Sequence, residues 1–121
     1  MGKKILIVDD EYHITRSLAF LFQKEGYDPL VAYDGPGAIE QMKKRKPNLI
    51  FLDVDIPGKN GYEIAQEVRN SPVWKGIPIL MLSAKGQEID RQKGIESGAD
   101  EYILKPFDPR AILAKVKTII G

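Results

Sequence analysis

The chain has 121 residues, 43% of them hydrophobic and 29% charged, and a formal net charge of +1. This composition is that of one folded domain with its own core, and the near-neutral net charge gives no indication of bulk attraction to nucleic acid or to an anionic membrane. Cysteine is absent and the N-terminal residues lack the apolar segment of a signal peptide, which excludes disulfides and thiolate chemistry and favours a cytoplasmic location.

Apolar segments that predict strands alternate along the chain with segments that have the apolar spacing of helices. In chain order, strands are expected at 4–8, 29–33, 48–52, 78–82 and 101–105. The helices between the first four strands are expected to carry Ile14, Leu18, Leu21 and Phe22, then Ile39 and Met42, then Ile64, Ala65 and Val68. The last helix should begin with Asp108 as N-cap and Pro109 at its first position, followed by Ile112, Leu113, Val116, Ile119 and Ile120.

Five repeats of strand and helix predict βαβ units with right-handed crossovers, and therefore an α/β fold with a doubly wound five-stranded parallel sheet.

The fourth helix, at about 87–97, has the weakest pattern. Ile89 and Ile95 are its expected apolar anchors, and Gly94 lies inside it. A helix held so lightly is expected to move easily, although a short surface helix fits the same pattern.

Polar residues stand where four of the five strands end. Asp9, Asp10 and Glu11 follow the first strand, Asp53 the third and Ser83 the fourth, and Lys105 ends the fifth. Each fits an ordinary role alone, but ligands of open parallel sheets bind at the carboxyl ends of the strands. Converging carboxylates repel unless a cation lies among them, and a few oxygen ligands suit Mg²⁺ or Mn²⁺. Together with a hydroxyl and an ammonium, they indicate phosphoryl transfer to a carboxylate.

Four motifs occur in order on this frame: Asp9–Asp10 after "ILIV", Asp53-x-x-x-Pro57-x-x-x-Gly61, Ser83-Ala84 after "ILML", and "GADEYILKPF", which contains Lys105-Pro106. They resemble the receiver (response-regulator) domains of bacterial two-component signalling, and the resemblance covers the whole chain. It implies a (βα)5 flavodoxin-like topology with strand order 2-1-3-4-5. It also implies a single receiver domain over 1–121, with no output domain in the chain.

The resemblance further implies a role for each site residue. Asp53 would accept a phosphoryl group from a sensor histidine kinase or phosphotransfer protein. Mg²⁺, or Mn²⁺, would be bound by Asp9, Asp10, Asp53 and the main-chain carbonyl of Asp55. Ser83 and Tyr102 would form the switch pair, Lys105 would contact the phosphoryl group, and the Lys105–Pro106 bond would be cis.

The same resemblance bears on partners and activity. The surface of the fourth helix, fifth strand and fifth helix would bind a downstream protein or form a homodimer. Candidates for cross-pairs there are Lys93, Asp100, Glu101, Arg110 and Lys115, although ordinary solvated charges fit these residues equally well. No direct binding of nucleic acid or membrane is expected. The chain would not be an enzyme in the usual sense, since it would catalyse only its own phosphorylation and dephosphorylation.

One alternative and two departures from the family pattern remain. "FLDVD" also fits a haloacid-dehalogenase-type phosphatase with Asp53 as nucleophile and Asp55 as general acid and base. That motif belongs on the first strand of a longer domain, whereas here it ends the third. Ser83 stands where threonine is commoner, and Asp55 is an acid at a variable position that influences dephosphorylation.

Overall fold

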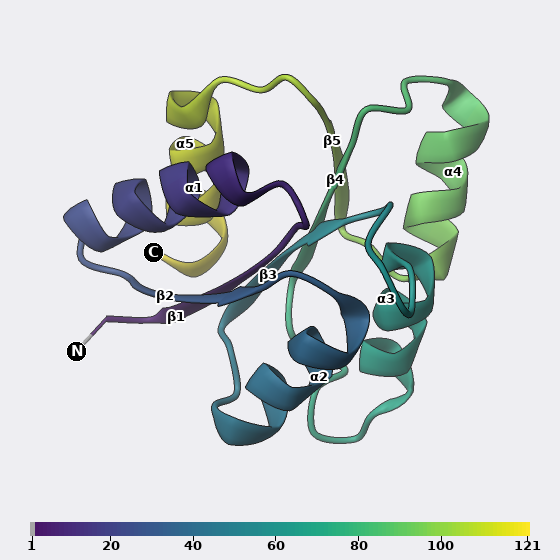
Figure 1. Cartoon of the computed structure of the whole chain (residues 1–121), viewed down its shortest axis with the longest axis horizontal. Helices are drawn as coiled ribbons and strands as arrows, with labels where there is room; N and C mark the ends of the chain where they lie inside the picture. The colour runs from purple at the N-terminus through teal and green to yellow at the C-terminus, as the bar shows by residue number, and fades with distance from the viewer. Residues whose placement is uncertain (1) are drawn as a thin grey trace.

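The computed structural model describes residues 2–121, which form a parallel five-stranded sheet with helices on both faces (Figure 1). The strands are β1 (Lys4–Val8), β2 (Asp28–Ala32), β3 (Leu49–Asp53), β4 (Ile79–Ser83) and β5 (Glu101–Leu104). The helices are α1 (Tyr12–Lys24), α2 (Gly35–Lys44), α3 (Gly61–Asn70), α4 (Glu88–Ser97) and α5 (Pro109–Ile120). None of these helices is long and apolar enough to cross a membrane.

The strand order is β2-β1-β3-β4-β5, and every neighbouring pair is parallel. This confirms the expected α/β class and the doubly wound, flavodoxin-like order. The chain moves outward from β1 to the β2 edge, then returns to place β3 on the other side of β1. The ends of β1 and β3 therefore flank the point where the strand order reverses, which is where open α/β sheets bind ligands.

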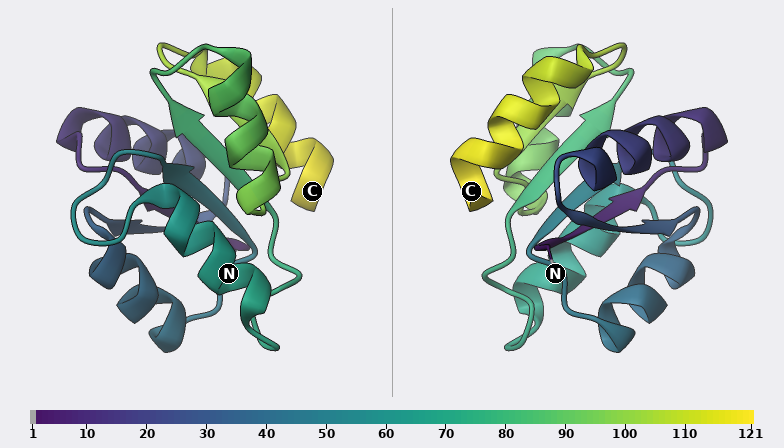
Figure 2. Two further views of the ribbon diagram at one scale, coloured as in Figure 1. Left: turned by 90° about the vertical axis from the view of Figure 1, so that its right-hand side faces the viewer. Right: turned by 90° about the vertical axis from the view of Figure 1, so that its left-hand side faces the viewer.

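Two apolar layers cover the sheet, as the nearly continuous apolar strands require. Figures 1 and 2 show α1 and α5 on one face and α2, α3 and α4 on the other. The first layer contains Leu18 and Phe22 of α1 with Ile112 and Val116 of α5, all almost fully buried. The second contains Ala38 and Met42 of α2 with Ile64, Ala65 and Val68 of α3. The apolar residues expected on α1, α2, α3 and α5 thus either form the core or, like Ile14 and Leu113, are partly buried and pack against it.

Three helices begin at side-chain caps, which fix where the loops above the sheet end. The Asp34 carboxylate accepts a hydrogen bond from the Gly37 amide at the start of α2. Asn60 and Glu63 form a capping box at the start of α3. Asp108 caps α5 by accepting a bond from the Arg110 amide, with Pro109 at the first helical position. The predicted N-cap and proline of the last helix are therefore confirmed.

The predicted anchors of α4 are wrong. Ile89 is 69% exposed and Ile95 is 38% exposed, whereas the buried residues of α4 are Gly94 and Ser97. The reason is that the Tyr102 ring and Met81 fill the space beneath the helix, so small residues must face the sheet. Among residues 2–121, no side chain caps the amide groups at the start of α4. Light anchoring of α4 stays a prediction, and it can no longer rest on Ile89 and Ile95.

Candidate functional site

Three aspartates converge at the carboxyl end of the central strands. Asp53 is the last residue of β3, and Asp9 directly follows β1; the register pairs Val8 with Leu52, so these two aspartates are neighbours. One carboxylate oxygen from each of Asp9, Asp10 and Asp53 lies within 4.8 Å of the others. Asp9 is 0% and Asp53 5% exposed, whereas Asp10 is exposed. The expected acidic cluster is therefore assembled, with one side open to solvent.

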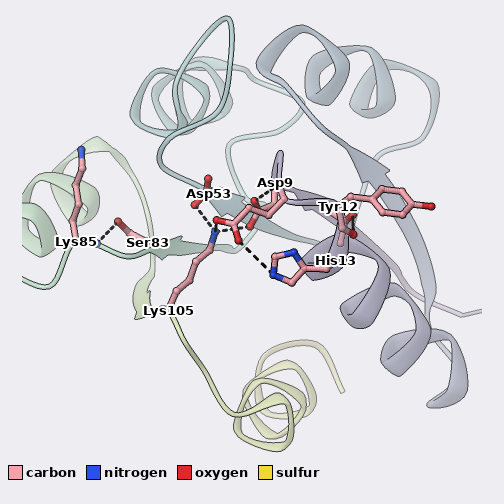
Figure 3. Close-up of polar contacts among 9 residues, drawn as sticks. Asp9, Tyr12, His13, Asp53, Ser83, Lys85 and Lys105 are labelled. Atoms are coloured by element: carbon pink, nitrogen blue, oxygen red, sulfur yellow. Dashed lines mark hydrogen bonds and ion pairs between the residues drawn. The ribbon is translucent and has the colours of Figure 1, made fainter.

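Lys105 supplies the positive charge of this cluster (Figure 3). Its ammonium nitrogen lies 2.7 Å from Oδ2 of Asp9, 3.0 Å from Oδ1 of Asp53 and 3.5 Å from Oε1 of Glu11. The residue follows β5, where its amide donates to the Ser83 carbonyl at 2.8 Å. Its peptide bond to Pro106 is cis. Lys105 thus brings the fifth strand into contact with both buried carboxylates.

The pKa values show that one ammonium does not balance these carboxylates. Burial, followed by the charge of Asp9, raises the pKa of Asp53 from 3.8 to about 6, against the opposing effect of Lys105. Burial lowers the pKa of Lys105, but its close ion pairs with Asp9 and Asp53 outweigh this and hold that pKa above 10.5. Excess negative charge therefore remains at the site, and a further cation would relieve it.

The residues of the cluster fit a hard divalent cation. Oδ2 of Asp9 is buried and accepts no hydrogen bond from residues 2–121, although the Lys105 ammonium lies 2.7 Å away. The donors are all carboxylate oxygens, which suit Mg²⁺ or Mn²⁺ rather than softer metals. The Asp55 side chain lies outside this group: it is 66% exposed and pairs with Lys85 at 3.4 Å. Asp55 could then contribute to metal binding only through its main chain.

Ser83 and Tyr102 are joined through a residue that the sequence did not indicate. Ser83 ends β4, is 1% exposed, and accepts a hydrogen bond on Oγ from the Lys85 amide at 3.0 Å. The Tyr102 hydroxyl donates to the Lys85 carbonyl at 2.8 Å. Lys85 therefore contacts Ser83, Tyr102 and Asp55. The sequence offered one signal for Lys85: it follows the end of β4 at the same distance as Asp55 follows the end of β3, and its charge is opposite. That signal is too weak to single out one lysine.

The raised pKa of Asp53 predicts how the metal-free protein responds to pH. Because folding raises this pKa, the stabilisation from protonated Asp53 is full below about pH 4 and is lost as the pH rises through about 6. The neutral amide of Asp53→Asn does not titrate, so the variant should become more stable than the wild type as the pH rises through this window. The difference in unfolding free energy should grow by about 3 kcal/mol, since each pKa unit corresponds to about 1.4 kcal/mol. Chemical denaturation of both proteins in EDTA from pH 4 to 8 measures the difference. A difference that is independent of pH would contradict the assignment.

Comparison with known proteins extends this description. A family model for the response regulator receiver domain matches residues 5–117. A response regulator from Chloroflexus aurantiacus is 36% identical, with a TM-score of 0.92 and coverage of 98% of each chain. Chemotaxis protein CheY4 of Vibrio cholerae is 31% identical, with a TM-score of 0.92 over 99% of this chain and 100% of that one. The receiver domain of RstA from Klebsiella pneumoniae is also 31% identical, with a TM-score of 0.89 over 97% of each chain.

Proposed function

The chain belongs to the response regulator receiver domain family, and we propose that it is a phosphoryl-accepting switch in which Asp53 takes one phosphoryl group from a histidine of a partner kinase or phosphotransfer protein. The observation that supports this most strongly is the placement of Asp53. It ends a buried strand, with the Lys105 ammonium at 3.0 Å and the carboxylates of Asp9 and Asp10 within the same oxygen cluster. That arrangement fits a nucleophile whose transferring group would be stabilised by Lys105 on one side and by a cation bound to the carboxylates on the other.

The proposed transfer follows from the charges at the site. Asp53, with a pKa of about 6, is ionised at neutral pH and can attack phosphorus, while the phosphorus–nitrogen bond of the donor histidine breaks. A divalent ion held by Asp9, Asp10, Asp53 and the main-chain carbonyl of Asp55 would neutralise charge on the transferring oxygens. Lys105 would bind one of these oxygens, and the Ser83 hydroxyl would donate to another.

The contacts of Lys85 suggest how the state of Asp53 reaches the surface. Ser83 now accepts a hydrogen bond from the Lys85 amide, and that bond would be lost if the serine side chain turned toward a phosphoryl oxygen. Tyr102 donates to the carbonyl of the same residue. We therefore propose that Ser83 and Tyr102 act as the switch pair and that their movement shifts the lightly anchored α4.

The proposed partners follow from this surface. We propose that a downstream protein, or a second copy of this chain, binds the face formed by α4, β5 and α5 in the phosphorylated state. Three of the candidates for pairs between copies are instead paired within the chain: Asp100 with Arg69 at 2.9 Å, and Lys115 with Glu101 at 2.6 Å.

We propose a cytoplasmic location, with no activity beyond self-phosphorylation and dephosphorylation.

Hydrogen exchange tests the switch. Beryllofluoride with Mg²⁺ mimics a phosphoryl group on aspartate and should change amide exchange across residues 84–107, because Ser83 and Tyr102 border that segment. Exchange followed by mass spectrometry, with and without beryllofluoride, gives the comparison. The matched control is Asp53→Asn, which lacks the carboxylate that coordinates beryllium and should show no change. Unaltered exchange of 84–107 in the wild type would contradict the switch.

The acid at position 55 separates this function from the phosphatase alternative. The Asp55 carboxylate is exposed and paired with Lys85, whereas the general acid of a phosphatase would act on the group bound to Asp53. Asp55→Asn should still be phosphorylated by acetyl phosphate, with a phosphoryl lifetime altered by about tenfold or less, equivalent to about 1.4 kcal/mol in barrier. The decay of labelled protein measures that lifetime. Loss of labelling in a folded variant, or turnover of phosphate esters by the wild type, would favour the phosphatase.

A further inference from the structure

Gly94 lies inside α4 without a local reason to be glycine. Its φ is not in the left-handed region, so backbone freedom does not explain it. In a helix interior, glycine is less favourable than alanine because it loses more backbone entropy on folding. Something other than the helix itself must then disfavour a side chain at this position.

The Tyr102 ring occupies the space that a side chain at Gly94 would need. A Cβ placed on Gly94 would lie 2.8 Å from Cδ1 of Tyr102 and 3.1 Å from the sulfur of Met81. The tyrosine is in turn held by its hydroxyl bond to the Lys85 carbonyl at 2.8 Å. The ring therefore lies directly against the backbone of α4, with no intervening side chain to absorb a change in its position.

α4 packs against α3 and β5, but few polar contacts hold it in place. At its C-terminal end, Nε of Arg69 donates to the Gly98 carbonyl at 2.9 Å. Near its middle, the Lys93 ammonium lies 4.7 Å from the centre of the Tyr62 ring. Toward the N-terminal end, Ile89 is 69% exposed and contributes nothing to the core. The helix is thus fixed at its C-terminal end, and its N-terminal half can follow a movement beneath Gly94.

We propose that Gly94 is the positioning residue through which the Tyr102 ring controls the position of α4. With the ring in its present place, the bare Cα of Gly94 allows α4 to lie close to β5. When the ring moves, the surface that supports the helix moves with it. The inference rests on the proposed role of Tyr102 in the switch, but the contact between the two residues can be tested independently of that role.

The contact is tested by a double-mutant cycle at equilibrium. Gly94→Ala in the wild type should raise the unfolding constant about tenfold, because the new Cβ and the ring cannot both keep their places. In a Tyr102→Ala background the ring is gone, and Gly94→Ala should leave the constant unchanged or lower it. If Gly94→Ala folds only together with Tyr102→Ala, the coupling is present in its strongest form.

Gly76→Ala is the matched control, since a Cβ at Gly76 would meet nothing within 4 Å. It should have the same small effect on the unfolding constant in both backgrounds. An effect of Gly94→Ala that is also the same in both backgrounds would overturn the proposed contact, whether or not Asp53 accepts a phosphoryl group.

Control of α4 is tested by exchange in Gly94→Ala itself. This variant leaves the carboxylates, Ser83 and Lys105 untouched, so Asp53 should be labelled by acetyl phosphate as in the wild type. Exchange of residues 88–97 without beryllofluoride should already be faster than in the wild type, and beryllofluoride should add little change. If beryllofluoride changed the exchange of residues 88–97 in Gly94→Ala by as much as in the wild type, the inference would be overturned. Failure of the wild type to accept a phosphoryl group would instead overturn the proposed function.

Discussion

In an Asp53→Asn variant, incubation with acetyl phosphate and Mg²⁺ is expected to leave no phosphoryl group on the protein, with labelling reduced by about a thousandfold or more. The amide cannot act as the nucleophile that the carboxylate provides. Asp9 cannot take its place, because it is 0% exposed and holds the Lys105 ammonium at 2.7 Å. Intact-protein mass spectrometry over a time course measures the loss.

Asp55→Asn is the matched control for that result, since it makes the same chemical change two residues further along. Its carboxylate is exposed and pairs with Lys85 rather than with the oxygen cluster. The two variants should therefore differ sharply in labelling while both remain folded. Labelling of Asp53→Asn at the wild-type rate would show that the phosphoryl group goes elsewhere.

A Lys105→Ala variant is expected to accept the phosphoryl group but to lose the exchange change across residues 84–107. The metal ligands remain, so transfer should continue, slowed by about tenfold to a hundredfold through loss of one charge-stabilising group. What is lost is the link between Asp53 and the fifth strand, which the ammonium makes at 3.0 Å. Exchange is compared in protein that is fully labelled, so that slower transfer does not affect the result.

The experiment needs Mg²⁺ throughout and one control lysine. Without Lys105, Asp9 and Asp53 would be left uncompensated in a buried site, which is costly for the metal-free protein. Lys117→Ala is the control, because its ammonium pairs with Glu25 at 3.1 Å on the exposed surface, far from the cluster. It should be labelled and should switch as the wild type does. A normal exchange change in labelled Lys105→Ala would refute the role assigned to the lysine.

The fold followed from the sequence because its strongest signals are local. Continuous apolar runs in β1, β3 and β4 and the apolar spacing of the helices show directly which faces are buried. The caps of α5 at Asp108 and Pro109 were equally local. The anchors of α4 were not, because which residues face the sheet depends on neighbours from β4 and β5. Met81 and the Tyr102 ring leave no room for a side chain at Gly94, which faces them, and Ile89 is exposed.

The candidate site also has a part that the sequence predicted and a part that it did not. Asp9, Asp53 and Lys105 could be placed together from the sequence, since parallel strands bring their carboxyl ends to one edge of the sheet. The contacts of Lys85 could not, because they depend on how the loop after β4 turns back over Ser83 and toward Asp55. The spacing of apolar residues predicts strands and helices but not the conformation of a loop. The residue that joins Ser83 to Tyr102 therefore became visible only in the structure.

The acceptor can be located directly by reducing acetyl phosphate-treated wild-type protein with borohydride and mapping its peptides by mass spectrometry. Reduction marks the aspartate that carried the phosphoryl group. The expected result is a single modified residue, Asp53, in protein treated with Mg²⁺, and none in protein treated in EDTA. Modification of Asp9, Asp10 or Asp55 instead, or equal modification without a divalent metal, would contradict Asp53 as the metal-dependent phosphoryl acceptor.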